Sequence, residues 1–577
     1  MLKKFLARRN SNSHKYKKLN IVLILITPLY LLLMTELNQC QSFFRVGKFI
    51  ISSTSVFLFS LLIVSLIYAA LLFFTKKLYV TALIMGLGLF TLSCIEYFKY
   101  VTTGMHFILP DFILAPNAGE LIKFARIVVP VQMVLIFISF LAYVGVCYYL
   151  KPAINVKLRY SLPIGAGVLI LFAIVVATPV SGALYRYFNV IDAQNANAMT
   201  AKRRFENNEL VAFLTTDISD KIENIMRKPT GYSEQKVKTA LLPGENSVQS
   251  LKPNIIIILN ESHTDLRIHG EKIPDGVYDG YDKARANSVT GITEVPTYGG
   301  YTVRTEFELL HGLPVKSTGN SIAPHGLLRN RSHPTIARYL SDNGYNSVFI
   351  HPFNDITYDR GKAYSYYGFD SLKFDGQLDV SIPDFYGYAD DNALYDQIIF
   401  EMKTSSKPSF IFVTTMQNHL PYTDEKLDEY EFYLRGIQHT NNGLGEFISR
   451  LENFEQDTLL LFMGDHLPYF SDINNFYDRN GLSTGDMQKI YEQQYLVYNN
   501  FGLNVTLPQN KISTFFLPYV LIDNIGLPKS PLIATMLDKM NKTPVYSTST
   551  GFDDELLDML TYDRIKGGNY AARTPLN

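Results

Sequence analysis

Five long apolar runs in the first third of the chain are the feature that most restricts its fold. Each is close to the roughly 20 apolar residues that a membrane-spanning α-helix needs. A buried helix of a soluble protein rarely continues for so long with so little charge. The runs cover residues 19–36, 49–74, 78–98, 127–150 and 160–180. We therefore predict a membrane domain of five α-helices over residues 1–185.

The lysines and arginines outside these runs predict the orientation of the helices, because cytoplasmic loops are enriched in both residues. The basic N-terminal tail and two short basic loops fall on one side of the membrane, whereas the loops on the other side are longer and their basic residues more dispersed. The short loops contain Lys76, Lys77, Lys151, Lys157 and Arg159. We expect this side to be cytoplasmic. Five crossings then place everything after about residue 185 outside the cytoplasm.

The overall charge gives no indication of nucleic-acid binding, and the positions of the cysteines exclude cysteine chemistry from most of the chain. The 577-residue chain has a formal net charge of zero and a pI of about 7.2, so nothing in its overall charge indicates a nucleic-acid partner. Its three cysteines are Cys40, Cys94 and Cys147. The chain beyond Cys147 therefore contains no disulfide, thiolate metal site or cysteine nucleophile.

The remainder of the chain divides into a polar linker and an α/β domain. Residues 186–252 are polar and include an amphipathic helical pattern, so we expect a linker there. From residue 253 to 577, short apolar runs typical of strands buried on both faces alternate with helical patterns. The expected strands are 254–260, 346–350, 409–414 and 458–463, and the expected helices are 335–343, 392–403 and 429–451. This alternation predicts a mostly parallel central sheet with flanking helices.

Ionisable side chains follow all four predicted strands. Glu261 follows the first strand and His351 the second, while His419 comes after the third and Asp465-His466 after the fourth. Open parallel sheets bind ligands at the carboxyl ends of their strands. Each of these residues taken alone is compatible with an ordinary loop or a salt bridge at the rim of the sheet. Their recurrence after four strands indicates a functional site.

Thr302 is the candidate nucleophile. It follows Gly299 and Gly300 and precedes a helical pattern, so it is expected at a helix N-terminus, where free N–H groups favour phosphate. The alternative is that Thr302 only caps this helix. Together with Glu261 and Asp465-His466, Thr302 forms an oxygen and nitrogen ligand set that suits Mn²⁺, Mg²⁺ or Zn²⁺. Such an ion would lower the pKa of the Thr302 hydroxyl and activate it.

Three further residues are candidates for handling phosphate. Arg360 can form bidentate contacts with phosphate oxygens, and His419 can protonate a leaving oxygen near neutral pH. His351 is a candidate for the same pocket, although it is equally compatible with an ordinary hydrogen-bonded histidine.

Residues 254–572 resemble the sulfatase-like domain of the alkaline-phosphatase superfamily. The resemblance is strongest to the membrane phosphoglycerol transferases and lipoteichoic acid synthases, which also have N-terminal membrane spans. It rests on the order of several motifs, each weak by itself. These motifs are Asn-Glu-Ser at 260–262, Gly-Gly-x-Thr-x-x-Thr-Glu-Phe-Glu at 299–308, Gly-Tyr-x-Ser-Val-Phe-Ile-His-Pro at 344–352, Asn-His-x-Pro-Tyr at 418–422, Gly-Asp-His-Leu-Pro at 464–468 and Tyr-Asp-Arg-Ile-Lys-Gly-Gly-Asn-Tyr at 562–570.

The resemblance implies a role for each candidate residue. The metal ligands would be Glu261, Thr302, Asp465 and His466, with Mn²⁺ as the expected ion and Thr302 as the nucleophile. The residues around the lipid headgroup and its phosphate would be His351, Tyr358, Arg360 and His419. The family often has tryptophan at the position of Tyr358, which weakens the assignment of that residue to headgroup contact.

The resemblance also implies an activity and a location. The expected reaction moves phosphoglycerol from phosphatidylglycerol to Thr302 and then to a hydroxyl of an envelope glycan, a lipopolysaccharide or a polymer, with release of diacylglycerol. The protein would lie in the bacterial cytoplasmic membrane with its catalytic domain in the periplasm or outside the cell. One alternative is phosphoethanolamine transfer, although exported domains of that branch typically carry disulfides. Another is an inactive membrane-anchored protein that binds envelope material.

Overall fold

The computed structural model describes most of the chain, in two compact units. The described residues are 17–109, 111–112, 128–177, 179–192, 198–223, 226–246, 251–321, 323–328, 332–422, 426–470, 476–482, 487–507 and 509–574. The units are Met1–Asn224 and Ile225–Asn577, so the boundary falls inside the segment 186–252 that we expected to be a linker. The basic residues before residue 17, and residue 127 of the fourth predicted run, lie outside the described residues.

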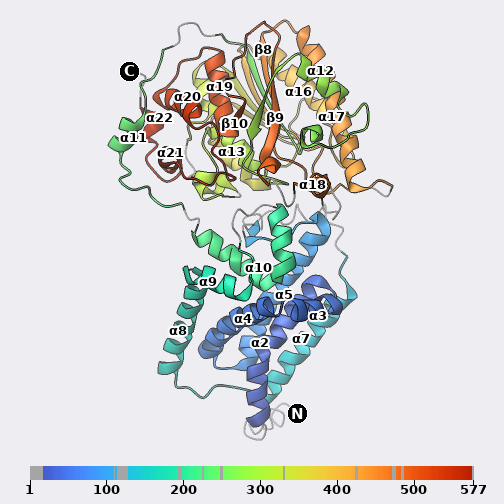
Figure 1. Ribbon diagram of the computed structural model, residues 1–577, viewed down its shortest axis with the longest axis vertical. Coiled ribbons are helices and arrows are strands. Elements are labelled where there is room, and N and C mark those ends of the chain that lie inside the picture. Colours follow the sequence, from blue (N-terminus) through green and yellow to red (C-terminus); the bar gives the residue numbers. More distant parts are fainter. Residues whose placement is uncertain are drawn as a thin grey trace. The chain divides into compact units, whose positions relative to one another are not determined.

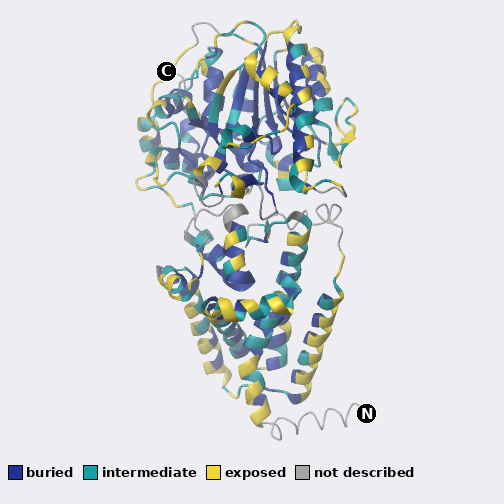
Figure 2. Cartoon of the chain, turned by 45° about the vertical axis from the view of Figure 1, so that its right-hand side comes forward, coloured by how far each residue is buried: buried dark blue, intermediate teal, exposed yellow. Residues whose placement is uncertain are grey.

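The first unit contains the predicted membrane helices. Among the described residues, five helices are long and apolar enough to cross a membrane, which confirms this part of the predicted fold. Many of their apolar side chains face outward, as in Leu25, Leu135 and Ile170, which are 72%, 59% and 61% exposed (Figure 2). Such surfaces suit contact with lipid. The five helices are α2 (Lys17–Cys40), α4 (Thr54–Thr75), α5 (Leu78–Thr103), α7 (Val131–Leu150) and α8 (Leu158–Ala177) (Figure 1).

The second apolar run differs from its predicted extent. A separate helix, α3 (Phe43–Ser52), ends at Ser53, whose N–H donates to Phe49 O at 3.0 Å. Helix α4 begins only at Thr54, whose hydroxyl donates back to Ile50 O at 2.7 Å. Serine and threonine compete in this way with the regular backbone hydrogen bonds of a helix. The predicted span 49–74 therefore loses its first residues to α3.

The two short basic loops lie at the same end of the first unit. Lys77 and Ala153 form an antiparallel bridge. Leu78 N–H donates to Pro152 O at 3.0 Å, and Ile154 N–H donates to Lys76 O at 3.3 Å. From their charge we expected these two loops on one side of the membrane, and the hydrogen bonds between them agree with that expectation.

The first unit also includes two helices beyond the last span, α9 (Pro179–Phe188) and α10 (Ala198–Glu223). Helix α10 is kinked at Glu209, which has a φ of 51°. The Glu209 carboxylate accepts a hydrogen bond of 2.6 Å from Gln39 and lies 3.3 Å from Arg45 Nε. The kink therefore brings a buried carboxylate to two polar side chains of the same unit.

The second unit is built around a sheet of eight described strands. Their order is β10-β2-β9-β8-β1-β7-β3-β4. Among them only β9 runs against its neighbours, so the sheet is mostly parallel, as predicted. The strands are β1 (Asn254–Asn260), β2 (Val289–Glu294), β3 (Asn346–Ile350), β4 (Ser371–Lys373), β7 (Ser409–Thr414), β8 (Thr458–Gly464), β9 (Glu492–Asn499) and β10 (Lys511–Ser513). The central strands β1, β7 and β8 are buried along their whole length.

Helices cover both faces of this sheet, as Figure 1 shows. One side carries α12 (Asp279–Ala286), α16 (Asp391–Thr404) and α17 (Glu429–Glu452). The other side carries α13 (Val303–His311), α14 (Ile336–Asp342), α19 (Leu517–Asn524), α20 (Pro531–Lys542) and α21 (Glu555–Ile565). On this second side Ile255, Ile257 and Leu259 of β1 share one apolar core with Phe307 and Leu310 of α13. The sheet is therefore a buried middle layer. Its functional groups can reach a ligand only at the ends of the strands.

The segment just before β1 packs on the C-terminal helices of the same unit. Helix α11 (Glu234–Ala240) contacts α21 and α22 (Tyr570–Arg573). The Tyr232 hydroxyl donates to Asp563 Oδ1 at 2.6 Å, and Lys236 Nζ lies 2.6 Å from Glu555 Oε1. These contacts anchor residues 226–246 to the α/β domain.

Candidate active site and metal centre

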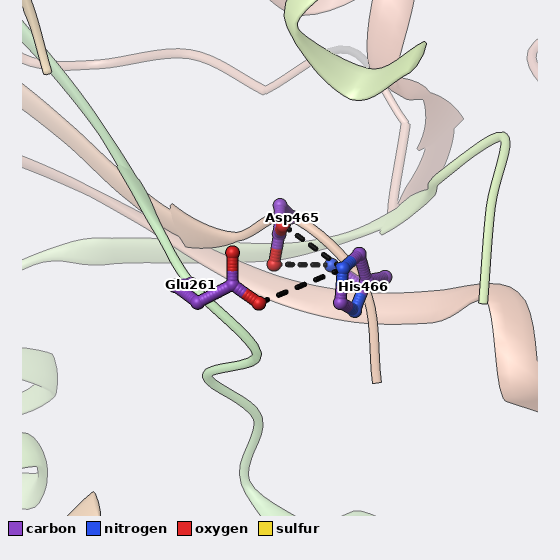
Figure 3. Close-up of side chains that lie close together, drawn as sticks. All are labelled: Glu261, Asp465 and His466. Atoms are coloured by element: carbon purple, nitrogen blue, oxygen red, sulfur yellow. Dashed lines mark hydrogen bonds and ion pairs between the residues drawn. The ribbon is translucent and has the colours of Figure 1, made fainter. Parts of the chain in front are cut away.

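Glu261, Asp465 and His466 meet at the carboxyl ends of β1 and β8. The two strands pair in parallel with Asn260 opposite Gly464, so the residues that follow them emerge side by side. His466 Nε2 lies 3.1 Å from Asp465 Oδ2 and 3.8 Å from Glu261 Oε1. Figure 3 shows the three side chains pointing toward one another. All three are buried, and each offers a ligand atom within 4.8 Å of the other two.

The hydrogen bonds around this cluster leave its ligand atoms available for a cation. His466 Nδ1 donates to Leu467 O at 3.0 Å, so Nε2 carries the free lone pair. Asp465 Oδ1 accepts the backbone N–H groups of Ser262 and His466, each at 2.8 Å. Within the described part of the chain, Asp465 Oδ2 and His466 Nε2 are buried without a hydrogen-bond partner. Buried polar atoms are normally paired, so these atoms fit a divalent metal ion.

Electrostatics supports the same interpretation. Burial, followed by the nearby Asp465 carboxylate, raises the pKa of Glu261 above its ordinary value. Two carboxyl groups this close in a dry site resist ionising together unless a positive charge compensates them. A divalent cation would supply that charge, and the ligand set of two carboxylates and an imidazole suits Mn²⁺, Mg²⁺ or Zn²⁺.

Thr302 lies beside this cluster, immediately before α13. Its Oγ1 donates to Glu261 Oε2 at 3.2 Å, and the residue is 7% exposed. Among the described residues its hydroxyl forms no capping hydrogen bond to the helix. The capping alternative considered from the sequence therefore does not describe this hydroxyl. The turn that delivers it needs left-handed backbone at Gly299 and Gly300, with φ of 67° and 147°.

His351, Arg360 and Glu306 form a second cluster, at the end of β3. Arg360 Nε and NH2 donate to the two Glu306 carboxylate oxygens at 3.2 and 3.0 Å. The third guanidinium nitrogen, NH1, donates to His351 Nε2 at 3.1 Å. His351 Nδ1 in turn donates to Thr414 O at 2.9 Å. Because Arg360 is only 3% exposed and bound to Glu306, its guanidinium is held rigidly rather than extended into solvent.

The charges within this second cluster are well defined. Burial alone would raise the pKa of Glu306, but Arg360 and then His325 hold that pKa well below its ordinary value. Burial, with a smaller contribution from Arg360, lowers the pKa of His351 to about 3. The cluster is therefore a carboxylate–guanidinium pair supported by a neutral histidine. The Tyr358 ring covers it, with its centroid 5.1 Å from Arg360 Cζ.

His419 stands after β7, and one charged residue of each cluster influences its pKa. Its Nδ1 lies 2.5 Å from Leu420 O and 3.4 Å from the hydroxyl of Tyr388. Burial holds the pKa of His419 below its ordinary value. Asp465 raises that pKa and Arg360 lowers it, both by less than burial does. The structure thus brings Glu261, Thr302, Asp465 and His466 together, and keeps His351, Tyr358 and Arg360 in a separate group.

Sequence reasoning missed four polar residues that support these side chains. Ser262 Oγ donates to Glu261 Oε1 at 2.8 Å. Asp391 Oδ2 accepts from Asn260 Nδ2 at 2.8 Å, just before Glu261. Glu306 and Tyr388 hold Arg360 and His419 as described above. Ser262 and Glu306 stand inside recognised motifs and were open to notice there, whereas Tyr388 and Asp391 follow no predicted strand.

Comparison with known proteins finds a family match within this domain. Residues 253–525 match the family model described as Sulfatase. Two curated relatives come from Rhizobium meliloti (strain 1021). A "Putative cyclic beta-1,2-glucan modification protein" is 24% identical over 336 residues, which cover 52% of this chain and 50% of the relative. The capsular polysaccharide biosynthesis protein RkpI is 29% identical over 229 residues, which cover 37% of this chain and 41% of the relative. The chain thus matches half or less of the length of each.

A solved structure supports the same fold. The Streptococcus pyogenes phosphoglycerol transferase GacH in complex with sn-glycerol-1-phosphate aligns with a TM-score of 0.51 and 20% identity. The alignment covers 60% of this chain and 98% of that one. The fold of residues 253–525 is therefore an α/β fold like that of GacH, and this stretch matches the Sulfatase model. The chain carries a domain that matches the Sulfatase model behind the five apolar helices of the described residues, as the sequence motifs predicted.

Proposed function

We propose that this protein is a phospholipid headgroup transferase that works through a covalent phospho-Thr302 ester. The observation that carries this proposal is the Thr302 hydroxyl, which rests on Glu261 beside Asp465 and His466 at the start of α13. A threonine that only capped the helix would hydrogen-bond to the helix backbone, whereas the Thr302 hydroxyl bonds to Glu261. The match to the Sulfatase family and the GacH-like fold support the proposal.

Glu261, Thr302, Asp465 and His466 would hold one divalent cation, with Mn²⁺ expected and Mg²⁺ or Zn²⁺ as alternatives, and its charge would lower the pKa of the Thr302 hydroxyl. Glu261 Oε2 accepts the hydrogen bond from that hydroxyl, so it offers the proton a first acceptor. The N–H groups at the start of α13 would stabilise the charge that develops on the phosphoryl oxygens.

The reaction has two halves. In the first, Thr302 Oγ1 bonds to the phosphorus of the lipid, the bond between phosphorus and the diacylglycerol oxygen breaks, and His419 gives that oxygen a proton. In the second, His419 takes a proton from an acceptor hydroxyl, which bonds to phosphorus while the bond to Thr302 Oγ1 breaks and Glu261 returns its proton to that oxygen. His351, Tyr358 and Arg360 border the headgroup in this scheme. The buried ion pair with Glu306 holds Arg360 in place beside the headgroup.

We propose phosphatidylglycerol as the donor and an envelope glycan, lipopolysaccharide or polymer hydroxyl as the acceptor. The motif order and the absence of cysteine beyond Cys147 support phosphoglycerol over phosphoethanolamine. The names of the two relatives, one for glucan modification and one for capsular polysaccharide biosynthesis, support a carbohydrate acceptor. The enzyme would sit in the bacterial inner membrane with its catalytic domain outside the cytoplasm, where both substrates meet.

Intact mass of the full chain tests the proposal. The protein is incubated with Mn²⁺ and vesicles of either phosphatidylglycerol or phosphatidylethanolamine, with Thr302→Ala and Thr302→Ser beside the wild type. We expect a glycerol-phosphate adduct on the wild type, none on Thr302→Ala, and a weaker one on Thr302→Ser, which keeps a hydroxyl. An ethanolamine-phosphate adduct would replace the proposed donor. If neither lipid gives an adduct or releases diacylglycerol, the protein is not a headgroup transferase, and binding of envelope material becomes the better explanation.

A further inference from the structure

A small hairpin outside the central sheet reaches the candidate active site. Its strands β5 (Asp384–Phe385) and β6 (Tyr388–Ala389) pair in antiparallel fashion. Tyr386 and Gly387 form its tip, with φ of 52° and 92°, as a two-residue hairpin turn requires. The hairpin is therefore a defined element and not an irregular loop.

Helix α17 holds this hairpin in place. The Phe385 ring stacks on the His439 ring, with centroids 4.1 Å apart and an interplanar angle of 12°. His439 Nε2 lies 3.1 Å from the Asp390 carboxylate, which follows β6. One side chain of α17 thus contacts the hairpin both before its tip and after its second strand.

The residue after this anchor connects the hairpin to the catalytic strands. Asp391 N–H donates to Gln417 Oε1 at 3.1 Å, two residues before His419. Asp391 Oδ2 accepts hydrogen bonds from Asn260 Nδ2 at 2.8 Å and from Thr440 Oγ1 at 3.0 Å. The base of the hairpin is therefore fixed to the two loops that carry Glu261 and His419.

Tyr388 uses this fixed position to contact His419. Its hydroxyl donates to Leu420 O at 2.9 Å and lies 3.4 Å from His419 Nδ1, with ring centroids 5.6 Å apart. His419 Nδ1 lies 2.5 Å from the same Leu420 O. A carbonyl oxygen only accepts, so Nδ1 carries a hydrogen and Nε2 is the nitrogen left for proton exchange.

We propose that Tyr388 is a positioning residue for His419. Its hydroxyl and ring hold the imidazole with Nδ1 on Leu420 O, so that Nε2 is presented to the diacylglycerol oxygen and then to the acceptor hydroxyl. Tyr388 itself exchanges no proton with a substrate. This inference rests on the proposed function and adds a residue that acts on its proton transfer.

The test removes only the hydroxyl, in the full chain with Mn²⁺ and phosphatidylglycerol vesicles. General acid–base catalysis contributes about 100- to 10,000-fold, so loss of its positioning is expected to lower kcat for diacylglycerol release about tenfold in Tyr388→Phe. The KM for lipid should change less than about twofold, because lipid binding is untouched. Tyr386→Phe is the matched control: it makes the same change at the exposed tip of the same hairpin and should leave kcat unchanged.

A double-mutant cycle separates positioning from general damage. In a His419→Ala background, Tyr388→Phe should cost less than about twofold more, because the two changes act through one group. Damage to the fold would instead reduce activity by the same factor in both backgrounds and would overturn the inference, as would a Tyr388→Phe enzyme with wild-type kcat. If the wild type itself releases no diacylglycerol from either lipid, the proposed function fails and the positioning role fails with it. A working wild type with an indifferent Tyr388 overturns the positioning role alone.

Discussion

Three histidines at the site share one hydrogen-bonding arrangement but differ in the group that their other ring nitrogen faces. In His351, His419 and His466, Nδ1 lies within hydrogen-bond distance of a backbone carbonyl, at 2.9, 2.5 and 3.0 Å. Each carbonyl fixes the tautomer and leaves Nε2 as the working nitrogen. What Nε2 meets then decides its role: carboxylates for His466 and a guanidinium for His351. For His419 we propose the reacting oxygens.

Two glutamates on α13 show how environment sets charge at the same burial. Glu306 and Glu308 are both 0% exposed. Arg360 and His325 overcome the effect of burial at Glu306 and lower its pKa, whereas burial raises the pKa of Glu308 to about 8. At pH 7 the Glu306 side chain is therefore a carboxylate and that of Glu308 is mostly a neutral carboxyl group.

We therefore expect opposite results from the same substitution at these two positions. At pH 7, Glu306→Gln should destabilise the protein by about 3–5 kcal/mol, because it leaves the buried Arg360 without its partner. Glu308→Gln should leave the protein at least as stable as the wild type, because an amide resembles a protonated carboxyl, still accepts from Val315 N–H and does not ionise in the unfolded state. Thermal unfolding of the full chain in detergent measures both.

The pH dependence gives the sign of each effect. A lowered pKa in the folded state stabilises above the ordinary glutamate pKa of about 4.3 and is lost as pH falls toward the folded value. The difference in stability between wild type and Glu306→Gln should therefore become smaller below pH 4. A raised pKa stabilises fully only below the ordinary value of about 4.3, so the wild type should lose stability relative to Glu308→Gln as pH rises from there through about 8. If the stability difference between wild type and Glu306→Gln instead grew in acid, the lowered pKa of Glu306 would be contradicted.

At the level of elements, Gly464 explains how β8 can deliver its two candidate metal ligands, Asp465 and His466. A Cβ atom at this position would lie 1.8 Å from His263 O, so only glycine lets β8 approach the loop that follows β1. We expect Gly464→Ala to cost about 1–3 kcal/mol by overpacking and to weaken Mn²⁺ binding, because Asp465 and His466 must move. Calorimetric titration with Mn²⁺ measures the second effect. Gly551→Ala, where a Cβ meets nothing within 4 Å, is the control, and equal Mn²⁺ affinity in the two variants would refute the argument.

The elements also show what a sequence reveals. The four strands 254–260, 346–350, 409–414 and 458–463 were predictable because strands buried on both faces form continuous apolar runs. We made no prediction for β2, which has two exposed residues at its start, or for β9, which begins Glu-Gln-Gln. Ligands that directly follow predicted strands were foreseeable, since parallel strands end at one edge. Tyr388 was not, since its contact with His419 spans 31 residues and depends on how the hairpin docks.

For the whole molecule, the remaining question is which side of the membrane each part occupies. The hydrogen bonds between residues 76–78 and 152–154 join two basic loops at one end of the membrane helices. Short loops with this charge stay in the cytoplasm. The α/β domain follows the five candidate spans of the described residues, so we expect its surface on the opposite side.

Cysteine labelling in whole cells tests that arrangement. The native cysteines are first replaced by serine, and a single cysteine is then introduced at an exposed position, either Lys157→Cys in the second basic loop or Lys407→Cys in the α/β domain. A membrane-impermeant maleimide should label Lys407→Cys in intact spheroplasts and Lys157→Cys only after permeabilisation, because the charged reagent cannot cross the bilayer. The reverse pattern would place the α/β domain in the cytoplasm. It would thereby remove the envelope glycans and lipopolysaccharide of the outer surface from its possible acceptors.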